Sequence, residues 1–541
     1  MSKSKDMSIG IDLGTTYCCV ACLDELGDPQ VQKNADGELE TPAALFFSRS
    51  GETVVGTRAK DMLPESPDRV VFDVKSAICT DTEYTVDFEK HTPAELTSVI
   101  LERIVKDFCR THSMESESKP YLRKATIGVP AHFGHSERET VLEAARNAGI
   151  GEPEILDEPT AVAIAYGYGH PDGGHKRILV FDLGGGTAEV TVLDVDGKSF
   201  SALSVESGRI GGLDFDGELK RLAVGKIVDK SGSDPENIQC DVFIQASLDL
   251  KTESLKKELS TSEKASESVA VSGKKVCFEI TRREFEESSS YLLDSAFELI
   301  DRALDAASAT ADELDCFVLS GGSSRIPMVA EGIRRRYPDV RVTVCDPAFA
   351  VAKGAAIFAG RDSNDVEVDS ILSKTYGIGI VSDGRRMVSN ILYRNSRIPY
   401  ESRKAFHPEA KGQAVASVEI YEDDADRGTP HTDIEDARRI GSFAFRLPEG
   451  CDKDTRVSVR LSVTRDGVLG VKAECGKQVG SCMIRTPSST SSKGALSEDP
   501  DVTRDPSARA QRARARPEAP ASRSWKGRGT TPCGAFPDGC S

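Results

Sequence analysis

The hydrophobic pattern of residues 1–361 alternates between short apolar runs and longer amphipathic stretches. The apolar runs predict strands at Ile9–Ile11, Lys124–Val129, Ile178–Phe181 and Cys316–Leu319. The amphipathic stretches predict helices at Thr92–Phe108, Ser136–Ala148, Phe243–Leu259 and Arg283–Ala307. Strands that alternate with helices are typical of an α/β domain, which we expect over residues 1–361.

The pattern changes after this domain. Residues 362–375 are polar and acidic, as in Asp365-Val366-Glu367-Val368-Asp369, and are interpreted as an interdomain linker. In residues 376–485 apolar and polar positions mostly alternate, as in Val457, Val459, Leu461 and Val463. Asp466-Gly467 lies between two such runs and is a strong hairpin signal. This second segment therefore predicts a small all-β sandwich domain.

The remaining residues, 486–541, have neither the length nor the period of a further folded domain. They are rich in Ser, Pro, Ala and Arg, and include the only tryptophan, Trp525. Such a composition predicts a disordered basic tail with no helical lid. The alternating arginines in this tail are interpreted as solvated charge.

Composition narrows the possible functions. A chain of 541 residues exceeds what one core supports, and its net charge of −18 argues against nucleic-acid binding. No stretch approaches the roughly 20 apolar residues of a membrane span, and the N-terminus lacks the apolar core of a signal peptide. We therefore expect a cytoplasmic protein with no membrane contact. The spacing Cys19-x-x-Cys22 suggests metal or redox chemistry, but residues three apart on a strand face opposite sides, so buried packing is favoured.

Two glycine loops carry the chemistry. Asp12-Leu13-Gly14-Thr15-Thr16 and Asp182-Leu183-Gly184-Gly185-Gly186-Thr187 each place an aspartate at a strand end, before glycines and a threonine. Glycine lets backbone N–H groups approach a phosphate, and the aspartate can hold hydrated Mg²⁺. A third loop, Ser320–Pro327, leads through Gly321-Gly322 into a helix whose amides favour an anion or a nucleoside edge. No G-x-x-x-x-G-K-[ST] motif is present, which excludes a P-loop.

These loops and two further landmarks, Val129-Pro130-Ala131 and Glu158-Pro159-Thr160-Ala161, occur in the order of a known family. From about residue 8 to about residue 475 the chain resembles the 70-kilodalton heat-shock chaperone family of the actin-like ATPase superfamily. The resemblance implies a two-lobed actin-like ATPase domain, followed by the β-sandwich that binds peptides in this family. It also implies ATP and ADP as ligands with Mg²⁺.

The resemblance assigns roles to individual residues. It implies catalytic roles for Lys75, Glu158, Asp182 and Thr187, and metal binding through water for Asp12 and Asp182. It implies nucleotide contacts for Gly14, Thr15, Thr16, Tyr17, Gly184, Gly185 and Gly186, with the phosphates cradled by Thr15, Thr16 and residues 184–187. It implies adenosine contacts for Glu253, Lys256, Lys257, Ser260, Gly321, Gly322, Ser323 and Arg325. Residues 253, 256, 257 and 260 share one face of a helix, for which a salt-bridged surface is the alternative reading.

Several positions depart from the family pattern. Asp157 stands in place of asparagine, Glu189 in place of aspartate, and Ala348-Phe349 in place of an acidic pair. Lys257 replaces an arginine, and lysine lacks the planar guanidinium that stacks on adenine. The acidic linker replaces a leucine-rich one, so weak coupling between the domains is expected, although Pro130 and Arg138 match the family's relay positions.

The leading hypothesis is an ATP-driven chaperone that hydrolyses ATP and binds extended segments of unfolded proteins. A peptide added as a strand would gain backbone hydrogen bonds, and without a lid it should leave quickly; a sandwich with no open groove is the alternative. The resemblance implies a J-domain co-chaperone and a nucleotide-exchange factor as partners, and a monomer is expected. The rival hypothesis is a nucleotide-gated regulatory protein. A small-molecule kinase of the same superfamily is disfavoured, because that function gives no role to the β domain.

Overall fold

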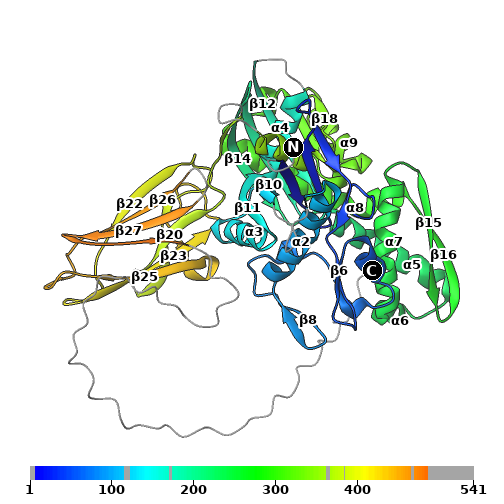
Figure 1. Ribbon diagram of the computed structural model, residues 1–541, viewed down its shortest axis with the longest axis horizontal. Helices are drawn as coiled ribbons and strands as arrows, with labels where there is room; N and C mark the ends of the chain where they lie inside the picture. Colours follow the sequence, from blue (N-terminus) through cyan, green and yellow to red (C-terminus); the bar gives the residue numbers. More distant parts are fainter. Residues whose placement is uncertain are drawn as a thin grey trace, which may run out of the picture. The chain divides into compact units, whose positions relative to one another are not determined.

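The computed structural model describes residues 7–114, 122–169, 174–360, 366–382, 384–464 and 468–484. The turn at Asp466-Gly467 and the tail from residue 486 lie outside the described residues, and so do the predictions made for them. The described part is a two-lobed α/β domain followed by a β-sandwich, as predicted (Figure 1). In this part no helix is long and apolar enough to cross a membrane.

The first lobe is built on a sheet in the order β11-β10-β1-β2-β3, with β4 paired to β2. Its strands are β1 (Ser8–Leu13), β2 (Tyr17–Leu23), β3 (Pro29–Gln32), β4 (Thr41–Pro42), β10 (Leu122–Val129) and β11 (Ile150–Asp157). Helices α2 (Pro93–Thr111) and α3 (His135–Asn147) pack on it through apolar residues such as Leu101 and Val141. The outer part holds α1 (Thr57–Asp61), β5 (Leu45–Phe47), β6 (Thr53–Val55), β7 (Val70–Val71), β8 (Tyr84–Val86) and β9 (Glu89–His91).

The second lobe repeats this plan with the sheet order β18-β17-β12-β13-β14-β19. Its strands are β12 (His175–Leu183), β13 (Ala188–Asp196), β14 (Ser199–Gly208), β17 (Cys316–Ser320), β18 (Val342–Val344) and β19 (Glu367–Asp369). Its helices are α5 (Gly212–Ser231), α6 (Pro235–Cys240), α7 (Val242–Leu259), α8 (Arg282–Ala307) and α9 (Pro327–Arg336). Two further helices lie between the lobes: α4 (Glu158–Gly169) packs on the second sheet and α10 (Ala350–Ala359) packs on the first. Figure 1 shows the hairpin of β15 (Lys264–Val271) and β16 (Lys274–Thr281) beside α5 and α7.

The twin glycine loops occupy equivalent places in the two sheets. One connects the antiparallel strands β1 and β2, and the other connects the antiparallel strands β12 and β13. In each sheet the first strand of this hairpin also pairs in parallel with a later strand, β10 or β17. The two loops are thus the same turn of a repeated fold, which explains why they share a sequence pattern.

Helices α4 and α10 cross so closely that a side chain does not fit between them. A Cβ built on Gly354 of α10 would lie 1.8 Å from the carbonyl oxygen of Ala161 in α4. A Cβ on Gly10 of β1 would lie 2.2 Å from the backbone nitrogen of Ala356. Glycine at both positions therefore allows the helices to approach each other and the first sheet, and Glu158 lies at the start of α4.

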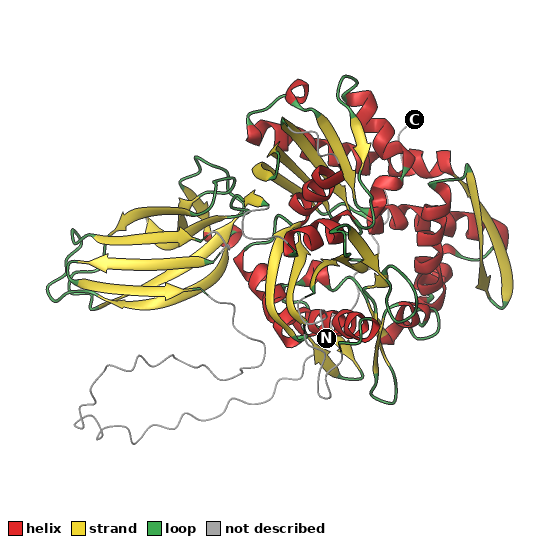
Figure 2. Ribbon diagram, turned by 45° about the horizontal axis from the view of Figure 1, so that its top comes forward, coloured by secondary structure: helices red, strands yellow, loops and turns green. Residues whose placement is uncertain are grey.

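The β domain consists of two antiparallel sheets. One has the order β24-β21-β20-β23-β25 and the other β22-β26-β27-β28. Their strands are β20 (Thr375–Ser382), β21 (Arg385–Leu392), β22 (Tyr400–Phe406), β23 (Val415–Asp423), β24 (His431–Asp433), β25 (Arg438–Arg446), β26 (Val457–Val463), β27 (Leu469–Cys475) and β28 (Gln478–Met483). Figure 2 shows this domain drawn almost entirely as strands. The alternating residues Val457, Val459, Leu461 and Val463 are all buried in its core, as the period of two predicts.

Two sequence interpretations have clear outcomes. Cys19 and Cys22 are both buried free thiols that pack into different apolar clusters, which confirms that they face opposite sides of β2. The acidic segment, by contrast, is not a plain linker, because Glu367–Asp369 forms β19 and pairs in parallel with β14. Val366 and Val368 pack against the apolar cluster around α4. These two valines therefore attach the segment to the second lobe, although its composition is mainly acidic.

Candidate functional site

A cavity of about 540 Å³, here called the interlobe cavity, is lined by both lobes of the α/β domain. It brings together residues that the sequence predicted from distant segments: Asp12, Gly14, Thr15, Thr16, Tyr17, Lys75, Glu158, Asp182, Gly184, Gly185, Thr187, Glu253, Lys256, Lys257, Ser260, Gly321, Gly322, Ser323 and Arg325. Gly186, the remaining predicted residue, lines an adjoining cavity instead. A concave site with converging polar groups is the form that a ligand site takes.

The twin loops meet at one end of the interlobe cavity, without room for further side-chain atoms. A Cβ on Gly185 would lie 2.0 Å from Oγ1 of Thr16, which belongs to the opposite loop. The N–H of Gly184 donates to the carbonyl of Thr187 at 2.9 Å, so the second loop is closed on itself. Backbone amides and threonine hydroxyls therefore surround one small space, as expected of a phosphate cradle.

The third loop is fixed beside the second. Gly321 has φ of 79°, and a Cβ there would lie 2.4 Å from Oδ1 of Asp182. The Ser323 hydroxyl donates to the carbonyl of Gly184 at 2.9 Å. The left-handed backbone and the close approach to Asp182 together require glycine at position 321. The predicted adenosine loop therefore packs directly against the predicted phosphate loop.

Buried carboxylates crowd the phosphate end of the cavity. Burial, followed by the charge of Glu158, raises the pKa of Asp12 to about 7. Burial and then Glu158 and Glu189 raise the pKa of Asp182 well above its ordinary value. Burial also raises the pKa of Glu158, although Lys75 opposes the shift. So many buried acids favour a cation among them.

Lys75 is the one predicted catalytic cation, and it is paired. Its Nζ lies 2.6 Å from Oε1 of Glu158, and both side chains are about nine-tenths buried. Burial alone lowers the pKa of Lys75, but Glu158 and Asp12 raise it overall. The lysine therefore stays charged at the point where the two loops meet.

The donor set fits a hard divalent cation. Mg²⁺ prefers carboxylate oxygens and water, and Asp12 and Asp182 supply carboxylates on either side of the cradle. Burial and neighbouring carboxylates raise the pKa of both groups, and the charge of Lys75 offsets these effects only in part. A cation held between these two residues, next to bound phosphates, would offset the remaining negative charge.

The predicted adenosine end holds a polar cluster that spans the lobes. Tyr17 donates its hydroxyl hydrogen to Glu253 at 2.5 Å, and Lys257 Nζ lies 2.8 Å from the same carboxylate. Nζ of Lys257 also lies 4.5 Å from the centroid of the Tyr17 ring. Lys60 of α1 forms a further ion pair with Glu253. The sequence did not indicate Lys60, because a lone lysine on a short helix carries no signal.

Two other predicted adenosine contacts are held by their own lobe. Lys256 Nζ lies 2.7 Å from Asp216 and donates to the carbonyl of Gly212 at 2.8 Å. Ser260 donates to the carbonyl of Lys256 at 2.9 Å. Both still line the interlobe cavity. Glu40 also lines it, and nothing in the sequence distinguished that residue.

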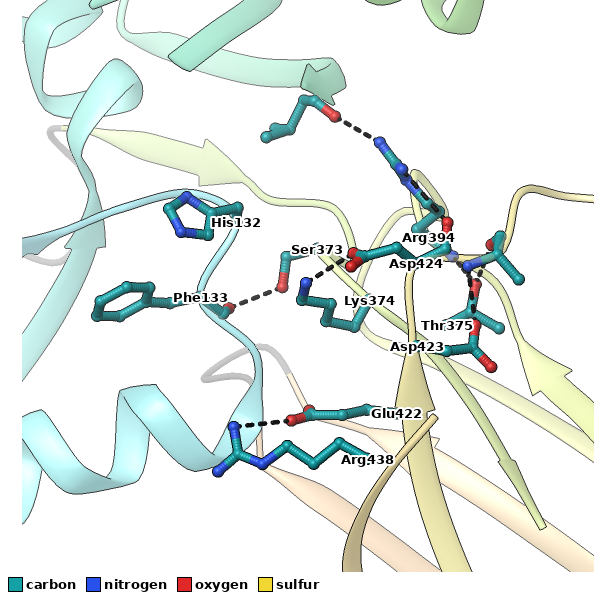
Figure 3. Close-up of polar contacts among 12 residues, drawn as sticks. His132, Phe133, Ser373, Lys374, Thr375, Arg394, Glu422, Asp423, Asp424 and Arg438 are labelled. Atoms are coloured by element: carbon teal, nitrogen blue, oxygen red, sulfur yellow. Dashed lines mark hydrogen bonds and ion pairs between the residues drawn. The ribbon is translucent and has the colours of Figure 1, made fainter. Parts of the chain in front are cut away.

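A second cavity, of about 1250 Å³, adjoins the phosphate end and shares Thr15, Lys75 and Thr187 with the interlobe cavity. The β domain closes its other side through residues such as Lys374 and Arg427. The segment that leads into β20 contacts the first lobe there, as Figure 3 shows for Ser373, whose hydroxyl donates to the Phe133 carbonyl at 2.8 Å. The phosphate end is therefore continuous with the domain interface.

Three more polar contacts hold the β domain at this interface. Arg394 forms an ion pair with Glu206 at the end of β14. Arg438 NH1 lies 2.6 Å from Oε1 of Glu137, and His135 contacts the carbonyl of Ile484. Each contact joins the β domain to β14 or to the loop and helix that follow β10.

Arg138 connects this interface to the base of the site. Its Nε donates to the carbonyl of Phe133 at 2.8 Å, and its NH2 lies 2.7 Å from Asp157, the neighbour of Glu158. Burial raises the pKa of Asp157 despite the arginine. The aspartate that replaces the family's asparagine thus forms an ion pair between the interface and Glu158, the predicted catalytic carboxylate.

Comparison with protein families agrees with this architecture. The family model described as "Hsp70 protein" matches residues 8–516, which covers both lobes and the β-sandwich.

Proposed function

Since the chain belongs to the Hsp70 protein family, we propose that it hydrolyses ATP to ADP and phosphate and uses this cycle to control the binding of extended polypeptide segments. The observation that carries the ATPase proposal is the convergence of both glycine loops on the paired Lys75 and Glu158 in one cavity. Phosphoryl transfer to water requires mainly positioning and charge neutralisation, and this end of the cavity can provide both.

The proposed roles follow from the contacts of each residue. Thr15, Thr16 and the amides of residues 184–187 bind the phosphates, while Lys75 positions the attacking water opposite the leaving group. Glu158 holds the Lys75 ammonium in place through the 2.6 Å contact. Mg²⁺, held by Asp12 and Asp182 through water, would supply the charge that neutralises the β- and γ-phosphates. Water is limited at this end because Glu158 and Asp182 are buried and Asp12 is partly buried.

The cluster of Tyr17, Glu253 and Lys257 is proposed to bind the adenosine side. With a lysine in place of arginine, stacking on the base is weaker and nucleotide affinity is expected to be lower. Gly321, Gly322, Ser323 and Arg325 would complete this end from the third loop.

The β domain is proposed to bind peptides as an added strand, with backbone hydrogen bonds providing affinity. Its contacts with the ATPase domain lie beside the phosphate end, which offers a physical route between the nucleotide and the peptide. A J-domain co-chaperone and a nucleotide-exchange factor are proposed partners, in a cytoplasmic setting and as a monomer. Protein folding under stress is the corresponding biological role.

The deciding experiment is steady-state ATP turnover by the full chain with Mg²⁺, with and without an extended apolar peptide. Turnover that rises with peptide supports the proposal, together with reduced aggregation of a denatured client. Absence of turnover, despite measurable nucleotide binding, would overturn the ATPase proposal.

A second function, nucleotide-gated docking of a partner without peptide cycling, is favoured by one observation. Lys257 is engaged by Glu253 and by the Tyr17 ring, so this position does not present a stacking surface for adenine. On this reading ATP binds and changes the β-domain contacts, but peptide does not alter turnover. The same assay separates the two functions.

A further inference from the structure

His132 lines the second cavity and contacts Glu189, which lines the interlobe cavity, and none of the proposed roles uses it. It belongs to the loop between β10 and α3 and lines the second cavity together with Lys75 and Thr187. Its side chain is 29% exposed and its ring packs edge-on against Phe133, with centroids 5.3 Å apart. Figure 3 shows His132 beside Phe133 in this loop. A histidine is thus held in the second cavity, which also contains residues of the phosphate end.

Glu189 orients this histidine. Nδ1 of His132 lies 2.5 Å from Oε1 of Glu189, and the other carboxylate oxygen accepts the Ala131 N–H at 3.0 Å. A carboxylate can only accept, so Nδ1 carries the hydrogen and Nε2 keeps its lone pair when the ring is neutral. Among the described residues none hydrogen-bonds Nε2. Burial opposes ionisation of Glu189, but the hydrogen bond from His132 lowers its pKa overall, which leaves an anion beside the ring.

The other polar groups at this end are already engaged. Glu158 pairs with Lys75, and Glu189 uses both oxygens on the loop of His132. Asp12 and Asp182 are the carboxylates assigned to the cation. His132 offers a nitrogen lone pair that no described residue occupies, so it can accept a proton released at the terminal phosphate.

We propose that His132, oriented by Glu189, accepts the proton of the water that attacks the terminal phosphate of ATP. The water oxygen bonds to phosphorus as the bond between that phosphorus and the bridging oxygen of ADP breaks. The water proton goes to Nε2, the imidazolium is stabilised by Glu189, and the proton then leaves to solvent through the second cavity. This inference rests on the proposed hydrolysis of ATP.

Several charged groups besides Glu189 face this part of the two cavities. They include Asp73 and Lys75 from the first lobe, Glu137 on α3, Glu158 on α4, Glu206, Arg209, Asp214, Arg302 and Asp305 from the second lobe, and Lys374, Arg394 and Arg438 from the segment after β19. They contribute to any pH dependence, so the test compares variants rather than interpreting one profile alone.

The test is His132→Ala in the full chain, with His175→Ala as the matched control. His175 is an exposed histidine on β12, with its Nε2 3.5 Å from Asp194. We expect His132→Ala to lower kcat by about 100-fold or more, with little change in the affinity for a fluorescent ATP analogue. Added imidazole should restore turnover, and the restoration should grow with pH as the neutral base accumulates. The His175 variant should behave as wild type.

Two results overturn the inference alone: kcat of His132→Ala within about threefold of an active wild type, or a loss that imidazole does not restore. A wild-type chain that binds ATP but never hydrolyses it overturns the proposed function as well. A further measurement uses the wild-type chain, so its result does not depend on whether a variant folds. The ¹⁵N chemical shifts of His132 should report hydrogen on Nδ1 in the neutral ring, and hydrogen on Nε2 would overturn the inference.

Discussion

The ammonium of Lys75 lies 2.6 Å from a carboxylate oxygen of Glu158, although 83 positions separate the two residues in the chain. Lys75 begins a short 3₁₀ turn in the first lobe, and Glu158 begins α4, which runs between the lobes. Each charge is buried, and neither would be stable there without the other. The pair therefore links the position of the proposed catalytic lysine to the packing of the central helix.

Replacing Lys75 by alanine should remove most of the ATPase activity. The variant loses the cation that positions water and neutralises phosphate charge, so kcat should fall by about 100-fold or more. Nucleotide binding should remain measurable, because the glycine loops and the adenosine end are untouched. Single-turnover hydrolysis and a binding titration check this, with Lys90→Ala as control, since the Lys90–Glu83 pair is exposed. Unchanged turnover would show that the role assigned to Lys75 is wrong.

The sequence predicts those features whose physical cause is local. The apolar runs at Ile178–Phe181 and Cys316–Leu319 exist because these strands are buried on both faces. Glycine stands in the loops because a side chain at Gly185 or Gly321 would collide with a neighbouring loop. Both patterns are visible in a few consecutive residues. For the same reason the predicted site residues could be listed before their common cavity was known.

What the sequence misses depends on contacts between distant segments. The ion pair of Lys60 with Glu253 and the hydrogen bond of His132 with Glu189 each join elements that no local pattern connects. Strand β19 is missed because three residues are too short to show a period of two, and its two acidic residues outweigh Val368 in composition. The domain interface has the same origin, since Arg394 and Glu206 are ordinary polar residues until the domains meet.

Replacing Arg394 by alanine should loosen the β domain from the ATPase domain. The arginine pairs with Glu206 and donates to the carbonyl of Val205 at 3.0 Å, with only 14% of its side chain exposed. Among the described residues, its loss leaves Arg302, with its Nε 3.3 Å from Glu206, as the ion-pair partner of this carboxylate. The free energy of docking should become less favourable by about 3 kcal/mol. Hydrogen exchange of the amides in residues 203–206 should accelerate.

The control for this change is Arg460→Ala, which removes an exposed pair with Glu401 within the β domain. Surface pairs of that kind contribute about 0–1 kcal/mol, so exchange at β14 should not change in the control. Equal exchange in the Arg394 variant and the wild type would contradict the prediction that this ion pair holds the domains together.

Docking of the β domain should weaken as pH rises through about 7. Burial and then the neighbouring Glu137 raise the pKa of Glu422 from 4.5 to about 7, while Arg438 and Lys374 oppose the shift. A carboxyl group whose pKa is higher in the docked state stabilises docking when it is protonated. The contribution of Glu422 to docking is therefore complete below its ordinary pKa and is lost as the pH rises through about 7. A Cβ on Gly134 of the ATPase domain would lie 2.5 Å from Glu422 Oε2, so separation of the domains would return this carboxyl to water.

Glu422→Gln tests this pH dependence because glutamine keeps the shape without the charge. The protection of the amides in residues 133–135, measured from about pH 6 to about pH 8, should fall in the wild type and stay nearly constant in the variant. Glu419→Gln on the same strand is the control, since Glu419 pairs with Arg386 inside the β domain. A variant that follows the wild-type profile would assign the pH dependence to another group.

Docking of β19 should determine whether peptide binding alters ATP turnover. The acidic composition of this segment suggested weak coupling, but Val368 lies opposite Phe200 in the parallel pairing with β14 and packs on the apolar cluster around α4. Val368→Asp places an unpaired carboxylate against that cluster, at a cost of several kcal/mol, and should release the strand. Peptide stimulation of turnover should then disappear while the basal rate persists. Glu367→Gln, on the exposed side of the same strand, should leave stimulation intact. Equal stimulation in Val368→Asp and the wild type would show that coupling does not pass through this strand.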